Sequence, residues 1–225
     1  ADSIALGAQQ VRNDGQIGAA HIDISAQSLQ QHGLISAQTA LSMQSVSDML
    51  LGSNSIIESQ SIELVAAQLL NQGQIGAGFA QITVQNDVRQ QGVIGADELR
   101  IAAGTEIVNS GLVDVNTLHI SAPLLRNETF DAVTNNGLVQ ARLDFQINGV
   151  RRIVNDGSLR INTAQPLVLD EIDNNGELTG GLRDLQVDTY RSAGGVLNGI
   201  DGLVLAAQQL ELGRAASAGS EPGAR

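Results

Sequence analysis

The sequence contains no cysteine and no lysine. The absence of cysteine excludes disulfides, thiolate metal sites and a cysteine nucleophile. The absence of lysine excludes a Schiff-base lysine and the lysine of a phosphate-binding loop. The chain has no run of about 18 apolar residues, and its start lacks an initiator methionine and the basic and apolar regions of a signal peptide. We therefore expect the chain to be an internal fragment of a longer protein.

Aromatic residues and positive charge are also scarce. Aromatics are 2% of a chain that is 42% hydrophobic, so the core must consist of Ile, Val, Leu and Ala in thin, regular layers. The 25 glycines against 3 prolines indicate many ordered tight turns. The formal net charge of −12 argues against binding to nucleic acid, which needs a basic face, and against electrostatic docking on anionic lipid.

What the sequence does contain is an internal repeat. The string Asn-Asp-Gly-Gln-Ile-Gly-Ala at 13–19 returns as Asn-Gln-Gly-Gln-Ile-Gly-Ala at 71–77 and as Gln-Gln-Gly-Val-Ile-Gly-Ala at 90–96. We place ten units, most of which begin 18 to 20 residues apart. Their first residues are Val11, Leu29, Leu51, Leu69, Val88, Ile107, Val133, Ile153, Ile172 and Arg191.

Two columns of the aligned units predict turns and a core. The turn column holds Gly15, Gly33, Ser55, Gly73, Gly92, Gly111, Gly137, Gly157, Gly176 and Gly195. A positive φ angle in every coil would explain so many glycines. Two residues later, every unit has Ile, Val or Leu, from Ile17 to Leu197, so this column must face a dry interior.

A third column, two residues before the turn, is rich in asparagine. Its members are Asn13, Asn71, Asn109, Asn135, Asn155 and Asn174, with Gln31, Ser53 and Gln90 in other units. Stacked amides can bond to the equivalent residues above and below, so we expect an inward Asn ladder. The alternative is a turn-favouring residue at the surface.

Each unit alternates apolar and polar residues with period 2, as in Ile22-x-Ile24-x-Ala26, which predicts strands with one buried face. The short polar separations leave no room for helical crossovers, so each strand must pair with its equivalent in the next coil. The predicted fold is all-β: a right-handed parallel β-helix of ten to eleven coils over residues 1–212, on the order of 50 Å long. Leucine-rich repeats share the period, but they need a helical or irregular segment after each strand.

The repeat is interrupted most strongly at Pro123 to Ala132, which contains Arg126, Glu128 and Phe130. Insertions in solenoids map to corner loops, where recognition often occurs, so these three residues are candidate binding residues. Drift of a tolerant loop is the competing interpretation. Residues 213–225 are small and polar, and we expect a linker or disordered tail.

Catalytic and metal-binding patterns are missing. The three histidines have no metal-ligand spacing, and we expect His21 and His119 to point outward from their strands. The acidic residues are scattered over the repeat, whereas catalysis on a β-helix would need them in one column of adjacent coils. We expect no enzyme activity, no cofactor and no metal.

The Asn-x-Gly-x-Val-x-Val of 109–115, followed by Leu-x-Ile-x-Ala at 118–122, resembles the repeats of filamentous haemagglutinin. The wider group is the two-partner secretion exoproteins, which includes adhesins and the stick-like effectors of contact-dependent growth inhibition. The resemblance covers roughly residues 4–212. It implies a stalk segment of a filament that is secreted to the surface of a Gram-negative bacterium through an outer-membrane transporter partner and that projects a binding or toxin region.

Two other functions stay open at this point. The first is a module that binds a host or target-cell receptor or a glycan through an inserted loop or one β-face. The second is a β-helix that cleaves a polysaccharide. As for assembly, we expect a monomeric rod whose truncated ends can stack on one another.

Overall fold

The computed structural model describes residues 2–129, 137–199 and 202–213, and within these ranges all regular secondary structure is β. The strands are β1 (Ser3–Asn13), β2 (Gln16–Gln31), β3 (Leu34–Ser45), β4 (Asp48–Leu51), β5 (Ile56–Ala66), β6 (Gln68–Asn71), β7 (Gln74–Val84), β8 (Val88–Gln90), β9 (Val93–Ala103), β10 (Glu106–Asn109), β11 (Leu112–Ser121), β12 (Leu124–Asn127), β13 (Leu138–Asn148), β14 (Arg152–Asn155), β15 (Ser158–Ile161), β16 (Leu167–Asn174), β17 (Glu177–Gly180), β18 (Asp184–Ser192), β19 (Val196–Gly199) and β20 (Val204–Leu212).

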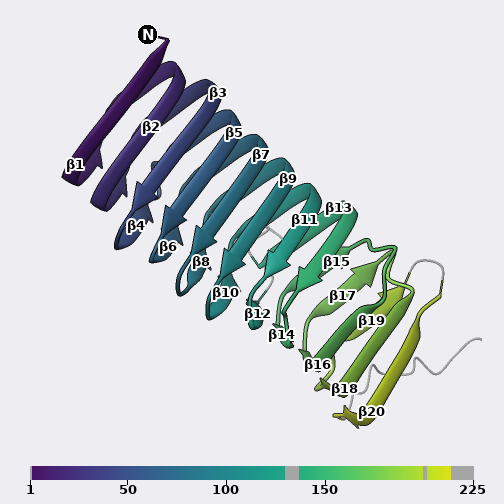
Figure 1. The fold of residues 1–225 in the computed structure, drawn as a ribbon. Coiled ribbons are helices and arrows are strands. Elements are labelled where there is room, and N and C mark those ends of the chain that lie inside the picture. The colour runs from purple at the N-terminus through teal and green to yellow at the C-terminus, as the bar shows by residue number, and fades with distance from the viewer. Residues whose placement is uncertain (1, 130–136, 200–201, 214–225) are drawn as a thin grey trace, which may run out of the picture.

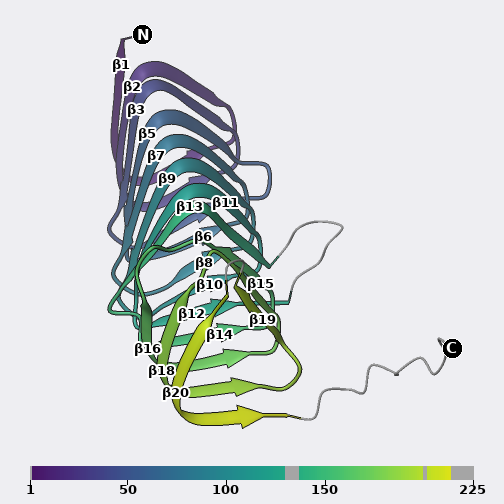
Figure 2. The ribbon, with the colours of Figure 1, turned by 90° about the vertical axis from the view of Figure 1, so that its right-hand side faces the viewer.

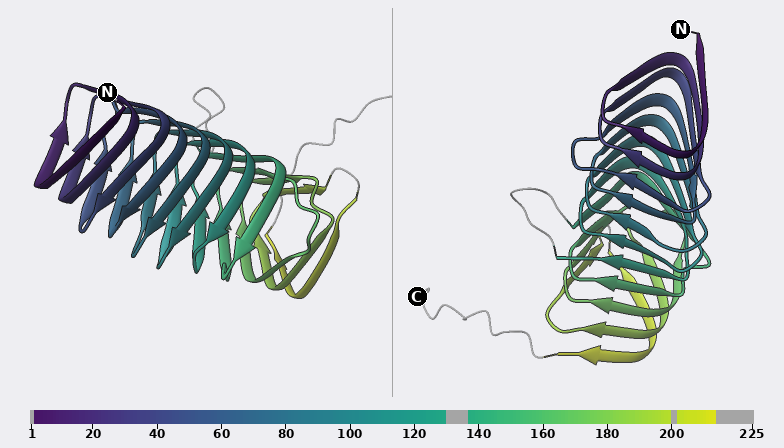
Figure 3. Two further views of the ribbon diagram at one scale, coloured as in Figure 1. Left: turned by 45° about the horizontal axis from the view of Figure 1, so that its top comes forward. Right: turned by 90° about the vertical axis from the view of Figure 1, so that its left-hand side faces the viewer.

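The strands wind into a parallel β-solenoid of about 11 turns, each of about 19 residues. Strand β7 pairs in parallel with β5 on one side and β9 on the other, and β8 pairs with β6 and β10 in the same way. Figures 1 and 3 show the result, a rod of stacked coils with β1 at one end and β20 at the other. The predicted all-β solenoid is confirmed. The leucine-rich repeat alternative is wrong because, within the described residues, a second paired strand follows each long strand of the regular coils, and no helix is present.

Each regular coil consists of one long strand and one short strand. In β7, Ile75 is buried before a bend, and Ala80, Ile82 and Val84 are buried after it. The bend lets one continuous strand follow two sides of the coil, and the long strands arch over the rod in Figure 2. Short strands such as β8 form the remaining side, so inward positions from all sides meet on the axis.

The core is made of columns of aliphatic side chains, as the composition predicts. The column two residues after the turn is in register from Ile17 to Leu197. Its members from Ile35 to Leu178 are at most 3% exposed. A second column runs through Ala80, Leu99, Leu118 and Phe145, so one of the few aromatic rings lies inside this stack.

The turn glycines have a different cause from the one expected. Only Gly137, with a φ of 69°, has a positive φ within this column. At seven other glycines of the column, from Gly33 to Gly195, the backbones of successive turns approach so closely that a side chain would not fit, whereas Gly15 in the first coil has room for one. A Cβ on Gly92 would lie 2.0 Å from the carbonyl oxygen of Gly73, and one on Gly176 would lie 2.0 Å from that of Gly157. The column therefore selects glycine for close stacking between coils.

Three unit boundaries differ from the sequence alignment. Met49, Leu125 and Tyr190 pair with the starts of the neighbouring units, in place of Leu51, Val133 and Arg191. In the sequence alignment, the start of each unit was placed four residues before its turn position. In the units of Met49 and Leu125 the extra residues lie between the short strand and that turn. A start placed four residues before the turn therefore falls after the true start of the unit.

Candidate functional site

The column of asparagine and glutamine side chains two residues before the turn, here called the ladder, is buried along most of the rod and lies inside the coils. Asn71, Asn109, Asn155 and Asn174 are at most 2% exposed. The amides bond from coil to coil: Asn109 Nδ2 donates to Asn127 Oδ1 at 2.8 Å, and Asn155 Nδ2 donates to Asn174 Oδ1 at 2.7 Å. They also serve the turns, since Asn71 Oδ1 accepts from the amide of Gly73 at 3.1 Å. A buried amide in this place satisfies backbone groups that would otherwise be costly.

Sequence reasoning missed one member of the ladder and one interruption of it. Asn127 pairs with Asn109 and Asn155, and it occupies the position assigned to Asn135, which lies outside the described residues. Leu51, not Ser53, pairs with Gln31 and Asn71, so the ladder is interrupted by one apolar residue. The spacing Leu-x-Asn at 125–127, which repeats Ile-x-Asn at 107–109, was the available signal for Asn127.

Of the three candidate binding residues of the insertion, two lie within the described residues. Arg126 lies in the middle of the regular strand β12, in register with Val108 and Val154. Glu128 follows the strand and is exposed, and its amide donates to the carbonyl of Asn109 at 2.8 Å. Phe130 lies outside the described residues. The insertion therefore begins after Asn127, and Pro123 to Asn127 belong to the solenoid.

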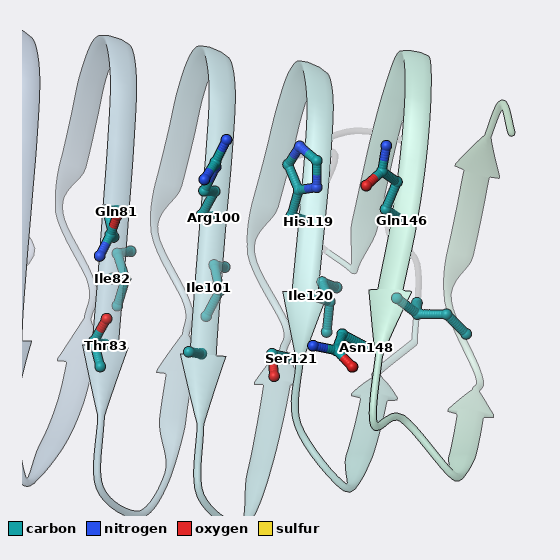
Figure 4. Close-up of a pocket in the computed structure, with 12 residues that line it drawn as sticks. Gln81, Ile82, Thr83, Arg100, Ile101, His119, Ile120, Ser121, Gln146 and Asn148 are labelled. Atoms are coloured by element: carbon teal, nitrogen blue, oxygen red, sulfur yellow. The ribbon is translucent and has the colours of Figure 1, made fainter.

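The structure instead brings together polar residues on the outer face of β7, β9, β11 and β13, in a shallow trench of about 530 Å³. Its floor is the backbone around Ile82, Ile101, Ile120 and Ile147, whose side chains point inward. One wall consists of Gln81, Arg100, His119 and Gln146, and the other of Thr83, Ala102, Ser121 and Asn148. Figure 4 shows the first wall as one row across four successive strands.

Beside this row lies a small charged cluster. The guanidinium of Arg100 lies 5.6 Å from the ring centre of Phe79, and its Nε donates to Glu98 Oε1 at 2.7 Å. His119 Nε2 lies 3.6 Å from the same carboxylate oxygen. Phe79 is only half-buried, whereas the other described aromatics, Phe145 and Tyr190, are 2% exposed. His119 points outward as expected, but the alignment with Arg100 requires the coil register and was not predicted.

Ion pairs elsewhere on the surface lie both between adjacent coils and within one coil. Arg142 donates to both carboxylate oxygens of Asp114, at 2.9 and 2.6 Å, and this raises the pKa of Arg142 above its usual range. Near the amino terminus, the hydrogen bond from Arg12 lowers the pKa of Asp14. Both pairs are at the surface, so each stabilises the fold only modestly.

No family model matches the chain, and no curated protein or solved structure is significantly similar to it. Within the described residues, no three His, Asp or Glu side chains are grouped so that they could hold a metal ion. The same part of the chain contains no helix of the length and hydrophobicity that crossing a membrane requires.

Proposed function

We propose that the chain is a stalk segment of a secreted, cell-surface filamentous exoprotein, either an adhesin or an effector of contact-dependent growth inhibition. In this role the coils hold a binding or toxin region away from the cell and perform no catalysis. An outer-membrane transporter is the proposed export partner. The resemblance of the repeats to those of filamentous haemagglutinin supports this assignment.

The observation that carries the proposal is the continuity of the inner columns along the rod. The apolar column stays buried from Ile35 to Leu178, and the amide ladder runs beside it with one interruption at Leu51. Because each coil packs only on its neighbours, stability grows with coil number and the length can be extended by repetition. A spacer needs these two properties.

Removal of one complete coil tests the role of spacer. Because Leu69 is in register with Val88, deletion of residues 69–87 joins equivalent positions and keeps every column aligned. In the full-length exoprotein, we expect the shortened filament to be exported and to keep its terminal activity, with a rod shorter by about 4.8 Å. Deletion of residues 69–78 is the control, since it removes about half a coil and breaks the register.

Surface labelling tests the location. Antibodies against the described coils should label intact cells that produce the exoprotein together with its transporter, and labelling should be lost without the transporter. Filaments that remain inside the cell under both conditions would contradict the proposal. Loss of the terminal activity after the 69–87 deletion, with export intact, would instead assign the activity to the coils themselves.

A further inference from the structure

We propose that the trench over β7, β9, β11 and β13 binds a linear polysaccharide that carries carboxylate groups. The polymer would lie along the rod axis, with about one sugar in contact with each coil. This inference goes beyond the proposed function, because a spacer needs no ligand on its flank. It rests on the lack of acidic side chains in the trench lining, on the free donors of Arg100 and the unused hydrogen-bonding groups beside it, and on the distance between successive strands.

The lining of the trench lacks the acidic side chains that are common in the chain. The chain carries 24 acidic against 12 basic residues, yet none of the described residues that line the trench is acidic. Its central coils instead contribute Arg100 and His119, side by side in the register of β9 and β11, with Glu98 next to them on the outer side of the row. By contrast, the trench over β4, β6 and β8 contains Asp48 and Asp87. An anionic chain therefore meets no carboxylate in the lining of the first trench, whereas it meets two in the second.

Arg100 is placed to recognise a planar carboxylate. Its Nε is engaged by Glu98, and the half-buried ring of Phe79 lies against the guanidinium. These contacts fix the plane of the group, while its terminal nitrogens make no hydrogen bond within the part of the chain that the structure describes. A fixed guanidinium with two available donors fits a carboxylate in a bidentate manner. A sugar ring with a carboxylate group provides this partner.

Both walls of the trench also offer neutral polar groups that can form hydrogen bonds with sugar hydroxyls. The side chains of Gln81, Thr83, Ser121 and Asn148 make no hydrogen bond to any other described residue. They provide amide and hydroxyl donors and acceptors on both sides of the charged centre, and they are visible in Figure 4. Successive strands are about 4.8 Å apart, which is comparable to the length of one pyranose unit, so each coil can contact one sugar.

Calorimetric titration of the full chain with oligogalacturonides provides the test. We expect binding of the tetramer to be clearly tighter than that of the dimer, because the trench spans four coils. Maltotetraose, which is neutral, should bind at least about tenfold more weakly, since it lacks the charge-assisted bonds. A sulfated dextran fragment should also bind more weakly. Equal binding of either comparison ligand, or no binding of the tetramer, would overturn the proposal.

Variants locate the site. Arg100→Gln should weaken binding of the tetramer by about tenfold, and Ser121→Glu, which adds a carboxylate to the trench, should abolish it. Arg89→Gln is the matched control, because Arg89 is also an exposed arginine with one acidic neighbour, but it lies in the trench with Asp48 and Asp87. Its affinity should be unchanged. Circular dichroism should show the same fold for all three, so a loss caused by misfolding would be recognised. If Arg89→Gln weakened binding as much as Arg100→Gln, the trench would not be the site.

Discussion

The coils up to β11 and the coils from β13 onward use the same inner columns but differ in regularity. Strands β7 and β9 have 11 residues each and pair along their whole length. Strand β13 also has 11 residues, but its partner β15 has four, so the second half of β13 lacks that neighbour. All five described glycines with positive φ lie at Gly137 or beyond.

The difference shows how the later coils are held together when strand pairing is shorter. Arg152 forms ion pairs with Glu171 and Asp173 on the next coil, and Arg191 contacts both of these and Glu211. In the earlier coils, long strands stack with few such pairs. Close backbone stacking and the amide ladder are common to both regions, whereas turn glycines with positive φ and cross-coil charges are concentrated in the later one.

The largest effect is expected from a side chain in the turn column of the regular region. Gly92→Ala places a methyl group 2.0 Å from the carbonyl oxygen of Gly73, and relief of this contact must separate two coils. We expect a loss of about 3 kcal/mol or more in the free energy of unfolding, measured by urea denaturation. Gly95→Ala in the same coil is the control, because its new Cβ would have its nearest neighbour at 3.9 Å. Equal stability of the two variants would show that close stacking does not select these glycines.

The next effect concerns the ladder where the two regions meet. Asn127 accepts from Asn109 at 2.8 Å and donates to Asn155 at 3.0 Å and to the carbonyl of Gly137 at 2.9 Å. Asn127→Ala leaves buried partners unsatisfied on both sides, so we expect a loss of about 2–3 kcal/mol in urea denaturation. Asn116→Ala removes an amide bonded to Asp97 at the surface and should change stability by less than about 0.5 kcal/mol. A similar loss for both variants would mean that burial of the ladder adds nothing.

A smaller loss of stability is expected when an ion-pair network of the later coils is removed. Arg191→Gln removes the contacts with Glu171, Asp173 and Glu211, and we expect a loss of about 1 kcal/mol at low salt. This loss should shrink in 1 M NaCl, because the groups are partly exposed and screened. Arg12→Gln, which breaks only the exposed pair with Asp14, is the comparison and should change stability less. A salt-independent loss for Arg191→Gln would point to packing of its side chain as the cause.

Sequence reasoning recovered the solenoid because its evidence is periodic. The column of Ile, Val or Leu repeats in every unit and the glycine column in all but one, and a one-residue shift would turn the whole core outward. Reasoning failed where insertions fall between two columns, since counting back from Gly137 reached Asn135 although Asn127 precedes the insertion. It also missed the trench, because Arg100 and His119 become neighbours only through the pairing of β9 with β11. The cause of the turn glycines was likewise invisible, since close backbone stacking depends on the coil below.

The smallest expected effect is the pH dependence of the first coils. The hydrogen bond from Arg12 lowers the pKa of Asp14 below its ordinary value of 3.8, so the ionised carboxylate is favoured in the folded chain. A carboxyl group with a lowered pKa stabilises the fold above its unfolded pKa, and this contribution disappears as the pH falls through the folded value. The urea midpoint of Asp14→Asn should therefore lie slightly below that of the unmodified chain at pH 6, and the gap should close as the pH falls below 3.8. A gap that persists at the lowest pH would mean that Asp14 acts through contacts other than its charge. We expect the loss of stability for Asp14→Asn to be smaller than that for Arg191→Gln, since the later coils carry more ion pairs. A larger loss for Asp14→Asn would contradict this order.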